Sequence, residues 1–374
     1  MNRRPSQSRT GFDSFSPQHT AHFKAAQPGG EFFEPKPRAS LGRRLLLALL
    51  LMTLIALAVN LAVNQFVRVA RVTVPIRRMD SAFEGYTLLQ ISDLKGATYG
   101  SNQALIRFAL QNEDFDAVVF TGDMVSSRGN AQPLYALIEM LRELKPDAPI
   151  YMIPGDKDPL PASMSYATGG SPFAPWVLGA KQRGGQLLSA PVQIERDGHT
   201  LWLTTSALLS LEMDTMQAQF ERQYLDALAD GDENAIELTT YNLQWLTETR
   251  NARAKMTDAD VYIALTHVPP ADEELESVYP GSLRERVHLV LCGHYQGGLI
   301  RLPFAGALFI PSQNLPLYGL LPGADTYFGL TRKGRTYLYV SPGLGGNDGL
   351  YPLPFFRLFN PPTVSLISLT TSSL

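Results

Sequence analysis

One nine-residue stretch organises this chain: Val290-Leu291-Cys292-Gly293-His294-Tyr295-Gln296-Gly297-Gly298. It begins as an apolar run typical of a buried strand and stops at a glycine and a histidine. Four other strand-like runs end in a similar way, and functional groups gather at the carboxyl ends of strands in α/β sheets. We therefore expect one shared site formed by this stretch with Ser92-Asp93-Leu94-Lys95, Thr121-Gly122-Asp123, Pro154-Gly155-Asp156-Lys157-Asp158 and Thr266-His267-Val268-Pro269.

The residue types at these strand ends indicate a metal site. Carboxylates and imidazoles are suitable ligands for Mn, Fe or Zn, and one carboxylate can bridge two such ions. A glycine directly precedes Asp123, Asp156 and His294, and it lets the backbone turn sharply where each strand stops. The candidate metal ligands are Asp93, Asp123, Asp156, His267 and His294.

Composition excludes several classes of protein. The chain has 374 residues, 45% of them hydrophobic, which is enough for a substantial core. Its single cysteine, Cys292, excludes an internal disulfide framework and a cysteine-based zinc cluster. Residues 1–44 hold eight of the 32 Lys and Arg and three of the 35 Asp and Glu, so the remainder is acidic. A nucleic-acid partner is therefore not expected.

The N-terminal region predicts a tail followed by a membrane helix. Residues 1–42 have the composition of a disordered basic tail, and residues 43–67 form an apolar segment long enough to cross a bilayer. The alternative is a cleaved signal peptide that uses Ala56-Leu57-Ala58 as its cleavage site. Basic residues flank the segment equally, so only the short tail favours a single-pass protein whose large domain is extracytoplasmic.

After a linker at 68–84, residues 85–369 alternate between strand-like and helix-like segments, and 370–374 form a short tail. This alternation predicts an α/β domain, and the hairpin-like spacing of the later segments predicts mixed sheets. Expected strands are 87–92, 117–121, 150–154, 192–195, 201–205, 261–266, 287–292, 308–311, 337–340 and 364–369. Expected helices are 102–112, 133–144, 176–183, 214–228 and 243–255, and Pro352-Leu353-Pro354-Phe355-Phe356 is a further candidate for packing or for a substrate cleft.

The order of the strand-end motifs resembles that of the calcineurin-like metallophosphoesterases, and is similar to their membrane-anchored bacterial branch. The resemblance runs from about Gly85 to Leu369 and includes Tyr339-Val340-Ser341-Pro342-Gly343-Leu344-Gly345. It implies a two-sheet β-sandwich flanked by helices, with a two-metal centre that hydrolyses phosphate esters. By this resemblance Asp93 is the aspartate of the first metal, Asp123 bridges, and the second metal is held by Asp156, His267 and His294.

Three positions depart from the family pattern. Lys95 and Gln296 stand where the family has the two histidines of the first metal, and Lys157 stands where it has the histidine that protonates the leaving group. A charged ammonium has no lone pair and cannot bind a metal. We therefore expect one ion rather than two, with Lys95 and Lys157 as the catalytic cations.

Two functions from different classes follow. The first is hydrolysis of a phosphomonoester or phosphodiester at the membrane surface through one divalent ion, with Lys95 and Lys157 stabilising developing charge. The second is a catalytically inactive module that binds a phosphate-bearing ligand. A third interpretation is a metal-free fold in which Lys95, Asp156 and Lys157 form structural ion pairs. Proximity to a membrane makes a lipid-linked phosphoester a candidate ligand for either of the first two.

Overall fold

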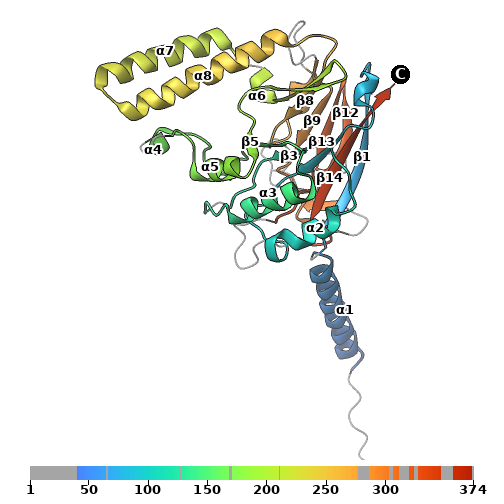
Figure 1. The fold of residues 1–374 in the computed structure, drawn as a ribbon. Coiled ribbons are helices and arrows are strands. Elements are labelled where there is room, and N and C mark those ends of the chain that lie inside the picture. The colour runs from blue at the N-terminus through green and yellow to red at the C-terminus, as the bar shows by residue number, and fades with distance from the viewer. Residues whose placement is uncertain are drawn as a thin grey trace, which may run out of the picture. The chain divides into compact units, whose positions relative to one another are not determined.

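The computed structural model describes residues 40–64, 66–126, 128–167, 171–209, 211–276, 286–302, 306–310, 320–323, 327–346 and 357–372. The expected tail at 1–42, apart from its last three residues, and the segment Pro352-Leu353-Pro354-Phe355-Phe356 lie outside the described residues. The chain divides into two compact units, Met1–Thr53 and Leu54–Leu374. The second unit contains all the sheets (Figure 1).

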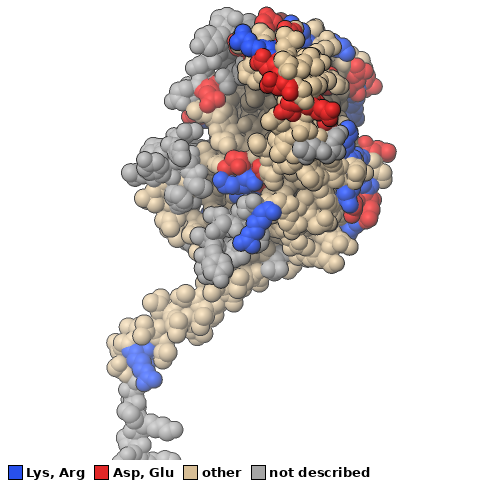
Figure 2. Space-filling model, turned by 90° about the vertical axis from the view of Figure 1, so that its left-hand side faces the viewer, with Lys and Arg blue, Asp and Glu red and all other residues tan. Residues whose placement is uncertain are grey.

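Helix α1 (Leu41–Val63) is long and apolar enough to cross a membrane. The expected segment at 43–67 is therefore a helix that begins two residues earlier and ends four residues earlier. In the space-filling view it is uncharged apart from basic side chains at its start, where the sequence has Arg43 and Arg44 (Figure 2). Its side chains are exposed except for Ala56, which is half-buried, and Asn60, which is buried.

The first sheet has the strand order β1-β14-β2-β3-β4-β5. Strands β2 to β5 are mutually parallel, β14 is antiparallel to β2, and β1 is parallel to β14. The inner strands β2, β3 and β4 are almost entirely buried because helices cover one face and the second sheet covers the other. The bounds are β1 Arg68–Arg77, β2 Thr87–Ile91, β3 Ala117–Thr121, β4 Ile150–Ile153, β5 Gly185–Leu187 and β14 Thr363–Ser372.

The second sheet has the order β12-β13-β9-β8-β7-β6. Strands β13, β9, β8 and β7 are parallel, and the two edge strands are antiparallel to their neighbours. The β6–β7 turn pairs Arg196 with His199. The bounds are β6 Val192–Arg196, β7 His199–Thr205, β8 Val261–Leu265, β9 Leu289–Cys292, β12 Gly329–Lys333 and β13 Thr336–Val340, with a separate hairpin of β10 Ile300–Leu302 and β11 Gly306–Phe309.

The two sheets pack face to face. Side chains from alternate positions of both sheets, including Leu88 and Val119 from the first and Ile263 and Leu291 from the second, form one buried cluster. Alternation along each strand sends the remaining side chains to the outer faces. The predicted α/β sandwich flanked by helices is confirmed, and so are its mixed sheets.

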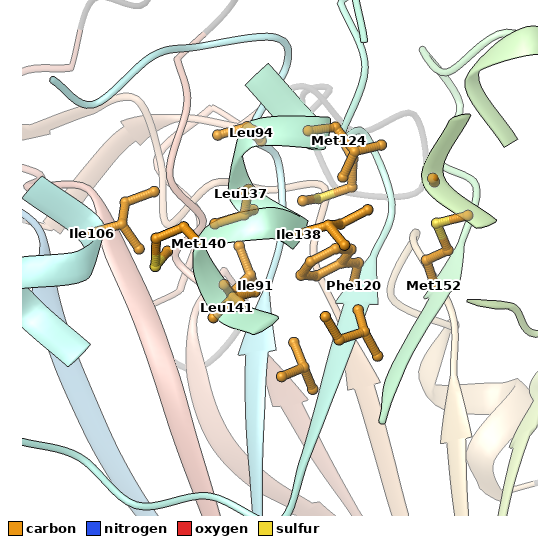
Figure 3. Packing of buried hydrophobic residues seen from close by; sticks show 14 of the residues in the cluster. Ile91, Leu94, Ile106, Phe120, Met124, Leu137, Ile138, Met140, Leu141 and Met152 are labelled. Atoms are coloured by element: carbon orange, nitrogen blue, oxygen red, sulfur yellow. The ribbon is translucent and has the colours of Figure 1, made fainter. Parts of the chain in front are cut away.

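Helices cover the outer face of the first sheet (Figure 1). In α3 (Gln132–Leu144) the residues Leu134, Leu137, Ile138 and Leu141 recur at helical spacing and pack on Phe120 and its neighbours (Figure 3). The other helices are α2 Ala104–Leu110, α4 Met164–Ala167, α5 Pro175–Gln182, α6 Ser206–Leu209 and α9 Asp272–Glu276, with 3-10 turns at Ser81–Phe83 and Ser101–Gln103.

Helices α7 (Met213–Asp230) and α8 (Glu233–Lys255) form a helical hairpin. Gly231 ends α7 in the left-handed conformation, and the Asp232 carboxylate caps the first turn of α8. The two helices are thus joined by a tight turn at Gly231 and Asp232. The face in Figure 2 shows many charged side chains over this hairpin.

The structure corrects three sequence predictions. Residues 68–77 of the expected linker form β1, which pairs with β14 along ten residues. The helix expected from 102 begins at 104, because Asn102 and Gln103 have positive φ. Helix α8 begins ten residues before the expected residue 243, because Asp232 provides its N-terminal cap.

Candidate metal centre

Backbone hydrogen bonds join the loops that follow the central strands at one end of the sandwich. We call this end of the sandwich the site edge. The Asp93 amide donates to the Gly122 carbonyl over 3.0 Å, and the Lys95 amide donates to the Asp123 carbonyl over 2.8 Å. The Gly293 amide donates to the His267 carbonyl over 3.0 Å. The five strand ends singled out in the sequence therefore meet, as predicted.

Three glycines permit this close approach. A Cβ on Gly155 would lie 2.2 Å from the Asp123 amide nitrogen, and one on Gly293 would lie 1.9 Å from Ser92 Oγ. A Cβ on Gly122 would lie 2.6 Å from His267 Nδ1. No side chain fits at these positions unless a neighbouring loop moves.

Backbone strain is concentrated at the site. Five side chains that face it have positive φ although they are not glycine, a conformation that costs about 1–2 kcal/mol per residue. Such strain persists only where surrounding contacts impose it. The five residues are Asp93 (φ 56°), Lys95 (φ 49°), Asp123 (φ 55°), His294 (φ 69°) and Gln296 (φ 52°).

Three ligand atoms, from Asp156, His267 and His294, converge on one point. His267 Nε2 lies 3.0 Å from Asp156 Oδ1 and 3.4 Å from His294 Nδ1, and His294 Nδ1 lies 3.3 Å from Asp156 Oδ1. Ligand atoms about 2.1 Å from a tetrahedral ion are about 3.4 Å apart, so these three spacings fit a single divalent ion. Asp123 Oδ2 lies 3.4 Å from the same His267 nitrogen and forms a second group of possible ligands with Asp93 and His267.

Hydrogen bonding also prepares His267 for this role. Its Nδ1 lies 2.8 Å from the Thr121 carbonyl oxygen, and a carbonyl accepts only from a protonated nitrogen. The opposite nitrogen, Nε2, can then present a lone pair to a metal. Burial opposes protonation of the ring, but ion pairs with Asp123 and Asp156 outweigh burial and raise the pKa of His267.

The carboxylates of this group are held in the ionised form. Hydrogen bonds from His267 and His294 hold the pKa of Asp156 well below its usual range. Burial opposes ionisation of Asp123, but His267, the Lys95 ammonium and the Lys157 amide together lower its pKa. The Lys157 amide donates to Asp123 Oδ1 over 2.8 Å, so this bond both orients the Asp123 carboxylate and stabilises its ionised form.

Lys95 lies in the other half of the site. Its ammonium is 3.3 Å from Asp123 Oδ2 and 3.9 Å from Asp93 Oδ1, and the residue is 5% exposed. The oxygen Oε1 of Gln296 is buried and has no hydrogen-bond partner among the described residues. A cation that is part of the chain thus lies between the carboxylates that a first metal would use.

The two halves differ in access to solvent. The side chains of His294, Asp156 and Lys157 are 20%, 37% and 54% exposed, whereas Asp93 and Lys95 are buried. The Lys157 ammonium lies 3.0 Å from Asp156 Oδ2, at the entrance. A ligand can therefore reach the His294 half directly.

Three supporting residues were not predicted from the sequence. Ser92 Oγ donates to Asp93 Oδ2 over 2.5 Å, and Asp158 accepts from the Gly155 amide over 2.8 Å. Burial raises the pKa of Asp158 to about 6. Ser92 and Asp158 could have been predicted, because both lie in the loops that directly follow strands. The third residue, Arg357, is fully buried and donates to the carbonyl of Gln296 over 3.0 Å, and no sequence pattern around it indicates this role.

Comparisons with known proteins identify the family of this chain. The chain is 26% identical over 268 residues to the uncharacterized metallophosphoesterase YkuE of Bacillus subtilis (strain 168), covering 70% of this chain and 73% of that one. Among solved structures it is similar to phosphopantetheinyl hydrolase from Mycobacterium tuberculosis, with a TM-score of 0.34 and 12% identity over 70% of this chain and 91% of that one. It is also similar to TT1561 of Thermus thermophilus, with a TM-score of 0.33 and 13% identity over 69% of this chain and 89% of that one. Residues 86–296, more than half of the chain, match the calcineurin-like phosphoesterases. The chain therefore belongs to the calcineurin-like phosphoesterase family.

Proposed function

We propose that this protein hydrolyses a phosphomonoester or phosphodiester with one divalent ion held by Asp123, Asp156, His267 and His294. The observation that carries the proposal is the set of spacings among Asp156, His267 and His294, 3.0 to 3.4 Å, which fits one coordination sphere. Asp123 is included because its Oδ2 lies 3.4 Å from the same His267 nitrogen. Family membership supplies the reaction class. Mn, Fe and Zn all suit this mixture of oxygen and nitrogen ligands.

A divalent ion bound there would polarise a phosphoryl oxygen or activate a water molecule. The chain supplies the remaining charges. Lys95 neutralises the buried carboxylates of Asp93 and Asp123, and the exposed ammonium of Lys157 can approach a phosphoryl group and stabilise charge that develops on it. With one ion bound, the two lysines and the ion outweigh the carboxylates of Asp93, Asp123 and Asp156 by one charge, which suits an anionic ester.

The proposal also places this reaction at a membrane. Helix α1 would serve as a single-pass anchor, with the domain in an extracytoplasmic compartment. A membrane anchor confines the enzyme to a surface and raises the concentration of any substrate confined there.

The test is elemental analysis of the full chain in detergent, together with hydrolysis of p-nitrophenyl phosphate and bis-p-nitrophenyl phosphate. We expect one ion per chain and turnover of one of the two esters. His267→Ala should lose both the ion and the activity. The matched control is His199→Ala, in the exposed β6–β7 turn, which should keep both. A wild-type chain that retains no ion after dialysis against Mn²⁺ or Zn²⁺ would contradict the proposal.

A second candidate function is an inactive module that binds phosphate-bearing ligands. The observation that favours it is the buried Lys95 ammonium between Asp93 and Asp123, which replaces a catalytic ion with a fixed charge. This candidate predicts binding of inorganic phosphate without turnover of either ester. Activity that is abolished in His267→Ala and retained in His199→Ala would exclude it.

A further inference from the structure

We propose that the ester hydrolysed at this site is carried by a membrane lipid, because the site opens at the end of the domain where α1 ends. This inference rests on the proposed function and specifies its substrate class. It is supported by strand direction, by a hydrogen-bonded link from α1 to the site, and by exposed aromatic side chains beside that link.

Strand direction places the site and the end of α1 at the same edge. Strand β1 starts at Arg68, five residues after α1 ends, and Arg68 pairs with Thr363 at the start of β14. Because β14 is antiparallel to β2, the start of β14 lies beside the end of β2. The Thr363 amide donates to the Gly343 carbonyl, and a Cβ on Gly343 would lie 3.0 Å from Asp93 Oδ2.

A short chain of hydrogen bonds joins the last turns of α1 to the site loop. Asn60, 2% exposed, donates from Nδ2 to the Arg357 carbonyl over 2.7 Å and accepts from the Phe359 amide over 2.7 Å. Asn64 Nδ2 donates to the same carbonyl over 2.6 Å. The guanidinium of Arg357 in turn donates to the Gln296 carbonyl, so one residue separates the end of α1 from the site loop.

Apolar side chains remain exposed beside this link. Phe66, Phe108 and Phe359 are 66%, 67% and 41% exposed. Phe66 and Phe108 line a groove of about 550 Å³ between the start of β1 and α2, together with Val67 and Leu105. Exposed apolar side chains gathered in one place mark surfaces that bind a membrane, a protein or a ligand, and these lie next to the end of an apolar helix.

The chemistry follows from this placement. Hydrolysis forms a bond between phosphorus and the oxygen of water, and breaks the bond between phosphorus and the leaving oxygen, which takes up a proton. A lipid that carries the phosphoryl group in its headgroup presents that group at the membrane surface, a few ångströms from where α1 ends. A site at the opposite end of the domain could not contact such a headgroup, because the two ends are at least one strand length apart. Strand β7 has seven residues and is about 23 Å long.

The placement can be measured without any activity. In full chains carrying Cys292→Ser and reconstituted in phosphatidylcholine vesicles, a fluorophore would be attached at Val268→Cys, beside His267 at the site edge, or at Asp197→Cys, in the β6–β7 turn at the far edge. A quencher attached to lipid headgroups should quench the fluorophore at 268 strongly and leave the one at 197 nearly unchanged. Equal quenching, or stronger quenching at 197, would overturn the inference.

The substrate class is tested with two esters that share a leaving group. Hexadecyl p-nitrophenyl phosphate in the same vesicles should be hydrolysed with a kcat/KM on the order of a hundredfold above that of methyl p-nitrophenyl phosphate in solution. Hydrolysis of the methyl ester alone would overturn the lipid inference and leave the proposed function intact. Hydrolysis of neither ester by a chain that does cleave p-nitrophenyl phosphate would overturn the lipid inference for diesters and leave the proposed function intact. A chain that binds its ion but cleaves none of these esters, p-nitrophenyl phosphate and bis-p-nitrophenyl phosphate included, would refute the proposed function, and the inference with it.

Discussion

Replacing Lys95 with methionine should lower the free energy of unfolding of the metal-free protein by about 3–5 kcal/mol. The ammonium lies 3.3 Å from Asp123 Oδ2 and 3.9 Å from Asp93 Oδ1. At an effective dielectric constant of about 20, these pairs attract by about 5 and about 4 kcal/mol. The cost of burying the ammonium offsets much of this attraction, but removing it leaves two buried carboxylates without their lysine counter-ion, and such a loss costs about 3–5 kcal/mol. Asp93 then keeps hydrogen bonds from Ser92 and the His294 amide, and Asp123 keeps its contacts with His267 and the Lys157 amide.

The assay is urea unfolding of the full chain in detergent with a chelator, followed by tryptophan fluorescence. The matched control is Lys145→Met, which removes an exposed ion pair with Asp114 and should change the free energy of unfolding far less than Lys95→Met does. With excess Mn²⁺, Lys95→Met should bind two ions per chain rather than one, because the carboxylates of Asp93 and Asp123 become available. If Lys95→Met is as stable as Lys145→Met in chelator, the buried ammonium is not the counter-ion described here.

Three further outcomes are expected. Gly155→Ala should lower kcat/KM about a hundredfold, because its Cβ would displace Asp123, whereas Gly198→Ala in the far turn should leave activity unchanged; a fully active Gly155→Ala would contradict the geometry. Arg357→Met should lower the free energy of unfolding by about 3 kcal/mol or more, since several buried carbonyls lose their donor, and a wild-type urea midpoint would refute this role. Burial lowers the pKa of His288, and its Nδ1 accepts a hydrogen bond from a backbone amide. The neutral imidazole therefore contributes its full stabilisation above about pH 6.5, and this contribution is lost as the pH falls. Below that pH, the urea midpoint of His288→Gln should fall less steeply than that of the wild type.

The central strands and the site could be predicted because their signals are local. Each of the strands β2, β3, β4, β8 and β9 is a short apolar run, and each is followed within a few residues by a polar group. The carboxyl ends of parallel strands meet at one edge, so the residues that follow them had to come together. This reasoning brought Asp93, Asp123, Asp156, His267 and His294 to one place without any knowledge of distances.

The missed features depend on contacts between distant parts of the chain. Strand β1 contains three arginines and a proline, a composition typical of a linker, and only its partner β14 makes it a strand. Proline is tolerated there because β1 lies at the edge of its sheet. Asn60 was missed for the same reason, since it donates to a carbonyl 297 positions away. Arg357 was missed because its guanidinium joins several loops, the farthest of them 61 positions away at Gln296.

The pairing of β1 with β14 has a consequence for biosynthesis. Asn60 and its acceptor at Arg357 are 297 residues apart, and a ribosome adds about 5–20 residues per second, so Asn60 and β1 wait roughly 15 to 60 s for their partners. During that interval β1 is an unpaired strand beside an emerging apolar helix, a combination that aggregates readily. The three arginines of β1, all exposed, are the charges that protect such a strand from pairing with another nascent chain. Completion of the first sheet therefore depends on the emergence of β14 from the ribosome.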